Sequence, residues 1–245
     1  MNIGHAETQM ERTRPLGLLV VVAATVALIF AGLNRLALPA PTLTSSAFVN
    51  QHVAYQLITL GLTAVVLLVL FLLGPTLFRR YFGLGEVGAP VEPVRLLGIN
   101  TNGRETWRQV GRNFAIIITA VTTVFIYLTL VRGQVSDPVP WGYLLFVPLL
   151  AATNAFVEEM ITRFGVVVSL EGIASRPVIY LVSAAVFGLA HYFGTPGGLP
   201  GVVLAGFMGW LLAKSVVETR GVFWAWFIHF LQDVVIFGGM FLVSL

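Results

Sequence analysis

Six ionisable side chains lie within three separate apolar stretches of this chain: Glu158, Glu159, Arg163, His191, His229 and Asp233. A charged side chain at the centre of a membrane-spanning helix costs about 2.5–3.5 kcal/mol on insertion scales, so such residues need a reason to be there. Glutamate, aspartate and histidine can activate water for hydrolysis, either directly or by holding a metal ion that does so. The six residues therefore either neutralise one another as a structural network or form a reaction centre inside a membrane.

The composition of the 245-residue chain is that of a membrane protein. Hydrophobic residues make up 57% of it, charged residues make up 10%, and the mean hydropathy is +0.90, whereas soluble domains carry about 25% charged residues. We predict an all-α polytopic helical bundle with the lipid bilayer as its main partner. The net charge of +3 follows from membrane topology, so no nucleic-acid partner is expected. The lack of cysteine excludes disulfides, a thiol nucleophile and a thiolate metal site.

About seven apolar segments are long enough to cross a bilayer as helices, which requires roughly 20 residues each. They cover approximately residues 16–33, 53–78, 113–131, 141–168, 177–194, 199–216 and 221–243. The first segment is longer than the core of a signal peptide and is followed by no convincing cleavage site, so we expect a retained membrane anchor. The sixth segment carries small residues that predict close helix packing, namely Gly201, Ala205, Gly206 and Gly209.

A long polar interruption at residues 79–112 contains prolines, glycines and six arginines, and we expect a loop there rather than a folded domain. We divide the chain into N-terminal helices with this loop, residues 1–140, and a catalytic core, residues 141–245. Seven spans place 12 of the 14 basic residues on one side of the membrane and leave only Arg35 and Arg132 on the other. The positive-inside rule then puts the N-terminus in the cytoplasm, and we expect an integral protein of the plasma membrane.

This topology brings the acidic and histidine side chains to similar depths. At about 1.5 Å per residue, Glu158 lies roughly 15 Å from the cytoplasmic end of its helix and His191 lies roughly 20 Å from the cytoplasmic end of its own. His229 and Asp233 lie roughly 12 and 18 Å deep by the same estimate. We therefore expect these four residues to meet near the middle of the membrane. His52 is expected in a loop, and no role is assigned to it.

The two neighbouring glutamates are expected to have different roles. Adjacent helix positions diverge by about 100°, so Glu158 and Glu159 cannot share one face. Glu159 and Arg163 stand four residues apart with the acid first, which is the favourable order for an ion pair, and we interpret them as a structural pair near the site. Glu158 is then free to act as a general base, a role that suits a carboxylate in an apolar surrounding. Asn154 lies one turn before it.

Several hydrolase signatures are absent from the sequence, which contains no His-Glu-x-x-His zinc motif, no Gly-x-Ser-x-Gly and no Gly-x-Gly-Asp. Three other motifs are present: Glu158-Glu159-x-x-x-Arg163, Phe187-x-x-x-His191 and His229-x-x-x-Asp233. In order and spacing these motifs resemble the signature of the CAAX prenyl protease 2 type (CPBP) family. This family of intramembrane glutamic endopeptidases also includes bacteriocin-processing and immunity-related proteins. The similarity covers approximately residues 141–240.

The resemblance implies a role for each of the four residues expected to meet. Glu158 and His191 would activate the attacking water, and His229 and Asp233 would stabilise the oxyanion of the tetrahedral intermediate, which can lower a barrier by several kcal/mol. Asp233 fits that role when it carries a proton or orients His229, because a bare carboxylate repels an oxyanion. Asparagine commonly fills this position in the prenyl-protease branch, so Asp233 is a departure from the family pattern.

The predicted function is therefore hydrolysis of peptide bonds in a peptide or membrane-protein substrate. No cofactor is expected, and a zinc ion held by Glu158, His191, His229 and Asp233 is an alternative that the resemblance does not favour. The alternative function is that of a non-catalytic immunity, scaffold or transport-related membrane protein that retains the fold and its polar network. Retention of all four groups favours the enzyme, because a purely structural descendant could lose any of them.

Overall fold

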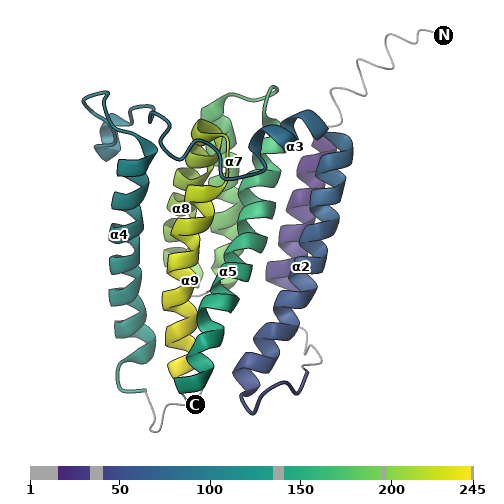
Figure 1. Cartoon of the computed structure of the whole chain (residues 1–245), viewed down its shortest axis with the longest axis vertical. Coiled ribbons are helices and arrows are strands. Elements are labelled where there is room, and N and C mark those ends of the chain that lie inside the picture. The colour runs from purple at the N-terminus through teal and green to yellow at the C-terminus, as the bar shows by residue number, and fades with distance from the viewer. Residues whose placement is uncertain (1–15, 34–40, 135–140, 195–196, 244–245) are drawn as a thin grey trace, which may run out of the picture.

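A computed structural model describes residues 16–33, 41–134, 141–194 and 197–243 of the chain. Within these residues the regular elements are helices, and no strand is present. The α-helices are α2 (Ala47–Leu73), α3 (Pro75–Tyr81), α4 (Trp107–Ile126), α5 (Phe146–Glu159), α6 (Gly165–Leu170), α7 (Arg176–Ala190), α8 (Gly198–Thr219) and α9 (Phe223–Val243). The long helices run side by side along one axis (Figure 1), which confirms the predicted all-α membrane bundle.

Five helical segments are long and apolar enough to cross a membrane: Ala47–Leu73, Trp107–Val131, Arg176–Phe193, Gly198–Thr219 and Phe223–Val243. They correspond to five of the seven predicted spans. The predicted span 16–33 contains the shorter apolar helix Leu16–Ala27 and the π-helical turn η1 (Leu28–Gly32). The predicted span 141–168 is built from several shorter helical pieces. The total of seven spans therefore stays a prediction.

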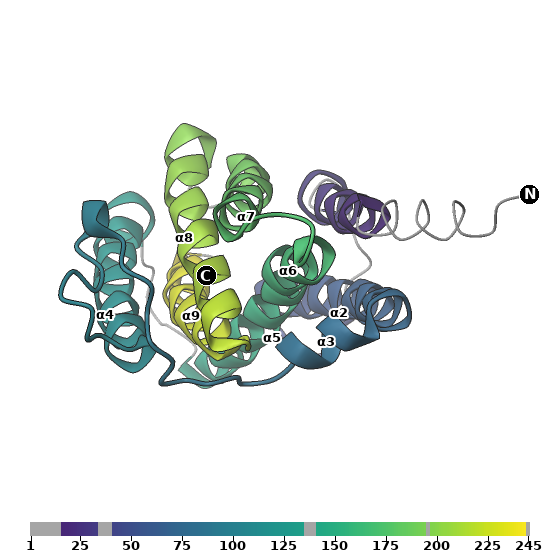
Figure 2. The same ribbon diagram turned by 90° about the horizontal axis from the view of Figure 1, so that it is seen from above.

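The central element of the bundle is a helix interrupted by one wider turn. α5 is followed directly by the π-helical turn η6 (Met160–Phe164), and α6 continues from it. Every residue from 157 to 170 is buried, and the surrounding helices pack on this segment from several sides (Figure 2). π-helical turns are rare and often occur at functional sites. This one begins directly after the glutamate pair.

Helices α7 and α8 approach each other closely because glycines face the contact. A Cβ atom added at Gly209 would lie 2.9 Å from the Cα of Ala184, and one added at Gly188 would lie 2.8 Å from the carbonyl oxygen of Val202. Side chains larger than hydrogen therefore do not fit at these two positions. The predicted small-residue packing is confirmed at Gly206 and Gly209, which both face α7. The close contact gives the end of α7 a rigid support.

The polar segment between α3 and α4 forms a packed loop that crosses the ends of the central helices (Figures 1 and 2). Its backbone meets the turn between α8 and α9, where the Val222 amide donates to the Gly83 carbonyl at 2.8 Å. The indole of Trp224 donates to the carbonyl of Val87 at 2.9 Å, and the indole of Trp107 donates to Glu218 at 2.8 Å. The loop is shorter than the predicted range 79–112, because residues 79–81 belong to α3 and residues 107–112 belong to α4. The contacts above fix the position at which α4 begins.

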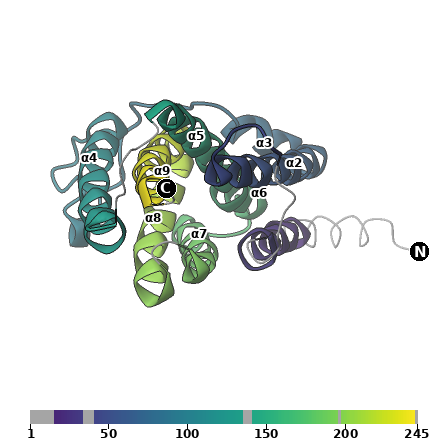
Figure 3. The ribbon, with the colours of Figure 1, turned by 90° about the horizontal axis from the view of Figure 1, so that it is seen from below.

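Helix α4 lies at one edge of the bundle and packs mainly on α9 (Figure 3). Near its C-terminal end, Gly239 of α9 leaves room for the side chain of Ile126. Nearer the start of α4, two threonines form hydrogen bonds with one glutamine of α9. Thr122 donates to the Gln232 oxygen at 2.6 Å, and the Gln232 nitrogen donates to Thr119 at 3.1 Å. α4 is therefore attached to the helix that carries His229 and Asp233.

Candidate active site

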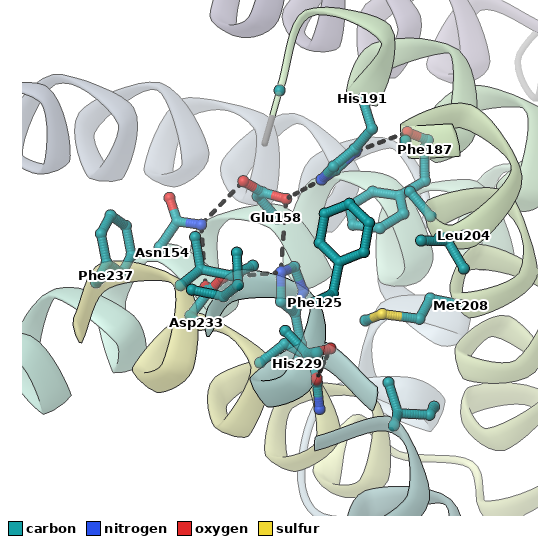
Figure 4. A pocket seen from close by; sticks show the side chains of 18 of the residues that line it. Phe125, Asn154, Glu158, Phe187, His191, Leu204, Met208, His229, Asp233 and Phe237 are labelled. Atoms are coloured by element: carbon teal, nitrogen blue, oxygen red, sulfur yellow. Dashed lines mark hydrogen bonds and ion pairs between the residues drawn. The ribbon is translucent and has the colours of Figure 1, made fainter. Parts of the chain in front are cut away.

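The structure brings together the four residues that the sequence analysis singled out. Glu158 lies near the end of α5, His191 directly follows α7, and His229 and Asp233 lie on one face of α9 (Figure 4). The Oε2 atom of Glu158 is 4.0 Å from Nε2 of His191 and 3.7 Å from Nε2 of His229. Oδ1 of Asp233 is 3.6 Å from the same His229 nitrogen. One carboxylate oxygen thus faces both imidazole rings.

His191 is oriented by its own helix. Its Nδ1 donates to the carbonyl of Phe187 at 2.9 Å, and the two rings lie with their centroids 4.1 Å apart. A carbonyl can only accept, so this contact assigns the proton to Nδ1. The other ring nitrogen, Nε2, is the one that faces Glu158. Phe187 and His191 are the two fixed residues of the second motif, and the structure gives their spacing a physical reason.

His229 is oriented by Glu159, a contact that the sequence analysis missed. Nδ1 of His229 donates to Oε1 of Glu159 at 2.6 Å, and Oε2 of the same carboxylate lies 3.2 Å from Nε of Arg163. Glu159 and Arg163 are completely buried, and the guanidinium stacks on Phe187 at 3.5 Å from the ring centroid. The predicted ion pair between Glu159 and Arg163 is present. It also serves as the support of a histidine in the site.

Asn154 joins two carboxylates of the site, and the sequence analysis gave it no role. Its side-chain nitrogen donates to Oε1 of Glu158 at 2.9 Å and to Oδ2 of Asp233 at 3.0 Å. Its side-chain oxygen accepts from Gln56 of α2 at 3.2 Å. The helical spacing of Asn154 and Glu158 was visible in the sequence, but the contacts with Asp233 and Gln56 depend on the tertiary fold.

These side chains form part of the wall of a cavity of about 920 Å³. The cavity is enclosed by α2, α4, α5, α7, α8 and α9, and much of its lining is apolar, including Ile117, Val121, Phe125, Leu204 and Met208. Its size is in the range typical of ligand sites, about 300–1,000 Å³. A polar reaction centre in the wall of an apolar cavity can hold an apolar substrate against groups that activate water.

The structure corrects the expectation for His52. This residue lies in α2 rather than in a loop, and it lines the cavity together with Tyr55. Its Nδ1 donates to the carbonyl of Phe48 at 2.8 Å, and its ring contacts that of Phe237 with centroids 5.4 Å apart. The predicted span began at residue 53, so an error of a few residues at the helix start produced the wrong placement.

The four residues are also those that would hold zinc in the alternative arrangement. Among the residues that the structure describes, no group of three or more histidine, aspartate or glutamate side chains is arranged to hold a metal ion. The three carboxylate–imidazole distances given above are 3.6–4.0 Å, each slightly longer than a direct hydrogen bond. An oxygen atom that lies beside such a pair, on the cavity side, can be within hydrogen-bond distance of both members.

Comparison with known proteins finds a family match over the part of the chain that holds this site. Residues 140–235 match the family model described as Type II CAAX prenyl endopeptidase Rce1-like. No curated protein and no solved structure matches the chain. The matched range contains Glu158, His191, His229 and Asp233, so the resemblance predicted from the motifs is confirmed. The chain is an integral membrane protein in which residues 140–235 are similar to the Rce1-like family model.

Proposed function

We propose that this Rce1-like chain is an intramembrane endopeptidase in which Glu158 and His191 activate water to hydrolyse a peptide bond. The observation that supports it most directly is the arrangement of Glu158. Its Oε2 atom is buried and accepts no hydrogen bond from the residues that the structure describes, and two imidazole nitrogens face it within 4.0 Å. A buried carboxylate oxygen without a donor is costly unless a further molecule satisfies it. A water molecule bound there would be the nucleophile.

The proposed reaction uses this water directly. An oxygen within about 2.6–3.2 Å of both Glu158 Oε2 and His191 Nε2 can donate one proton to each group. Glu158 takes a proton as the water oxygen attacks the carbonyl carbon of the scissile bond. The same proton then passes to the amide nitrogen as the carbon–nitrogen bond breaks, so the products are a carboxylic acid and an amine. Glu158 ends in the form in which it began.

His229 is proposed to stabilise the oxyanion. When both of its ring nitrogens are protonated, Nδ1–H binds Glu159 and Nε2–H points toward the space shared with Glu158 and Asp233. The carboxylates of Glu159 and Asp233 offset the positive charge of that ring. A preorganised donor of this kind can contribute several kcal/mol to the stability of the transition state. Asp233 contributes by orienting His229, or donates to the oxyanion itself when it carries a proton.

We propose that the reaction proceeds without a metal ion. The competing arrangement is a zinc ion held by the same four residues. Metal analysis of the purified protein and assays in the presence of a chelator distinguish the two. Full activity in chelator, with far less than one metal ion per chain, is the expected result. A stoichiometric zinc ion whose removal abolishes cleavage and whose return restores it would instead establish the zinc enzyme.

The substrate is proposed to be a peptide or membrane-protein segment with an apolar group that occupies the cavity. The matched family consists of prenyl endopeptidases, so a quenched-fluorescent peptide with a farnesylated CaaX end, tested in proteoliposomes, is a suitable reporter. The same peptide without the prenyl group shows whether the lipid is required. If neither is cut, proteins that accumulate in cells expressing an inactive variant provide the substrates for the assays below.

Replacing His191 with alanine is expected to lower the cleavage rate at least about 100-fold, because the attacking water loses one of the two groups that position it. The measurement is turnover of the reporter, combined with mass spectrometry of membrane proteins that accumulate uncut in cells. The neighbouring variant Tyr192→Phe serves as the control, since Tyr192 is half exposed and lies outside the cavity lining. Identical cleavage by the wild type and the His191 variant would favour the non-catalytic scaffold or immunity function.

The proposed orientation has the N-terminus in the cytoplasm of a plasma-membrane protein. The chain has no cysteine, so single cysteines can be labelled without background. Leu43 precedes α2 and Ile173 follows α6, and both are more than half exposed. An impermeant maleimide applied to intact cells is expected to label Leu43→Cys at once and Ile173→Cys only after permeabilisation. The opposite pattern would show the reverse orientation.

A further inference from the structure

We propose that Asn154 is the positioning residue that sets the geometry of both Glu158 and Asp233, and that Gln56 acts by fixing the orientation of its side chain. The inference rests on the proposed hydrolysis, because positioning is meaningful only if these carboxylates take part in it. Asn154 itself need not touch the substrate. It lies on α5 one turn before Glu158 and faces α9 on one side and α2 on the other.

The two oxygens of each carboxylate have different partners. Glu158 uses Oε1 to accept from Asn154 and directs Oε2 toward the two histidines. Asp233 uses Oδ2 to accept from the same nitrogen and directs Oδ1 toward His229. In each carboxylate one oxygen is anchored and the other is presented to the reaction centre. A single amide group thereby sets the rotation of two side chains that come from different helices (Figure 4).

Asn154 also reduces the electrostatic repulsion between the two carboxylates. Two carboxylates that face a common site repel each other when both are ionised. The side-chain nitrogen of Asn154 has two hydrogens, and each carboxylate receives one of them. The donor is neutral, so it stabilises both anions without adding a charge to the buried site. An aspartate at the same position would place a third carboxylate there, and a leucine would leave two anchored oxygens without a partner.

Gln56 binds the end of the Asn154 amide that faces away from the carboxylates. An asparagine side chain can present either its oxygen or its nitrogen, and only the nitrogen can hold carboxylates. Nε2 of Gln56 donates to Oδ1 of Asn154 at 3.2 Å, so the oxygen is directed toward α2 and the nitrogen toward the site. Gln56 is only 4% exposed, and the contact spans 98 residues of sequence. Gln56 thus acts on the carboxylates through Asn154.

Kinetics of four variants test this arrangement: Asn154→Leu, Asn154→Asp, Gln56→Leu and the double variant Gln56→Leu/Asn154→Leu. Misplacing a catalytic group by about 1 Å can cost about 100-fold in rate, so kcat is expected to fall about 10- to 100-fold in both Asn154 variants while KM stays close to that of the wild type. Gln56→Leu is expected to have a smaller effect. In the Asn154→Leu background it should have no further effect on kcat, because Gln56 acts only through the amide.

The controls separate positioning from packing and from failure of the proposed function. Thr153→Val changes the neighbouring residue of α5, whose hydroxyl only bonds back to its own helix, and is expected to leave kcat unchanged. Thermal unfolding in detergent checks that each variant is folded. If Asn154→Leu does not fold, Asn154→Asp and Gln56→Leu still carry the test.

Two outcomes would overturn the positioning role. One is wild-type kcat in a folded Asn154→Leu protein, and the other is a loss in the double variant equal to the combined losses of the two single variants. Failure of the proposed function would be recognised differently. In that case the wild type and Glu158→Gln would cleave every substrate equally.

Discussion

Replacing Glu158 with glutamine is expected to lower the rate of peptide hydrolysis about 10²- to 10⁴-fold, which is the usual contribution of a general base. Glutamine has the same shape and can still accept a hydrogen bond from Asn154 through its oxygen. It cannot take a proton from water, because its amide group is not basic. The effect is therefore expected in kcat, with substrate binding and thermal stability largely retained.

The matched control for this variant is Glu92→Gln, which makes the same chemical change on the surface. Glu92 is about half exposed and pairs with Arg176, and exposed ion pairs contribute only about 0–1 kcal/mol. Turnover of the reporter in proteoliposomes is the measurement. Wild-type turnover by Glu158→Gln would remove this residue from the mechanism and leave the cluster as a structural network.

Replacing Arg163 with methionine is expected to lower the free energy of unfolding by about 3–5 kcal/mol, because it leaves the carboxylate of Glu159 buried without its cation. Both side chains have no exposed surface. The double variant Glu159→Leu/Arg163→Met removes both charges, and apolar replacement of a whole buried pair is often neutral or stabilising. Thermal and chemical unfolding in detergent are therefore expected to show that the double variant recovers most of the lost stability.

Activity distinguishes the two roles of this pair. If Glu159 and Arg163 only support the fold, the double variant recovers turnover together with stability. The structure gives a different expectation, because Glu159 also accepts from Nδ1 of His229 at 2.6 Å. Loss of the carboxylate that orients a catalytic histidine can cost as much as about 10⁴-fold in a serine protease, so we expect turnover of the stable double variant to remain at least about tenfold low.

Much of this architecture could be predicted because it depends on local or one-dimensional properties. Hydropathy was enough for the all-α bundle. A rise of about 1.5 Å per residue was enough to place the glutamate, the two histidines and the aspartate at a common depth. The Glu159–Arg163 ion pair follows from helical spacing alone. The irregular segment between α3 and α4 was recognisable from its prolines and glycines, although its two ends, residues 79–81 and 107–112, are helical.

The remaining features depend on the tertiary fold. The contact between Glu159 and His229 spans 70 residues, and that between Asn154 and Asp233 spans 79. Hydrophobic periodicity contains no information on either. The π-helical turn after Glu159 could not be predicted from the sequence either, because an apolar run gives no sign of one extra residue in a turn. The catalytic roles, the division of the chain at residue 140 and the number of spans stay predictions.

The error at His52 could have been avoided. Ser46 is the N-cap of α2, and its side chain accepts from the amide of Val49 at 3.3 Å. Serine directly before an apolar segment is a recognised helix-start signal. If Ser46 is taken as the N-cap, the helix begins before His52. The His52 ring then lies one turn before Tyr55, on the wall of the cavity.

The helices on two sides of the cavity are attached to their neighbours in different ways. On the α8 side, the glycine contacts with α7 leave no space for movement. On the α4 side, the hydrogen bonds of Gln232 with two threonines join α4 to α9, and bonds of this kind between membrane helices average about 0.6 kcal/mol. These two bonds alone would therefore hold α4 only weakly, and its position also depends on Trp107 near its start and on Ile126 near its end, which contact Glu218 and Gly239.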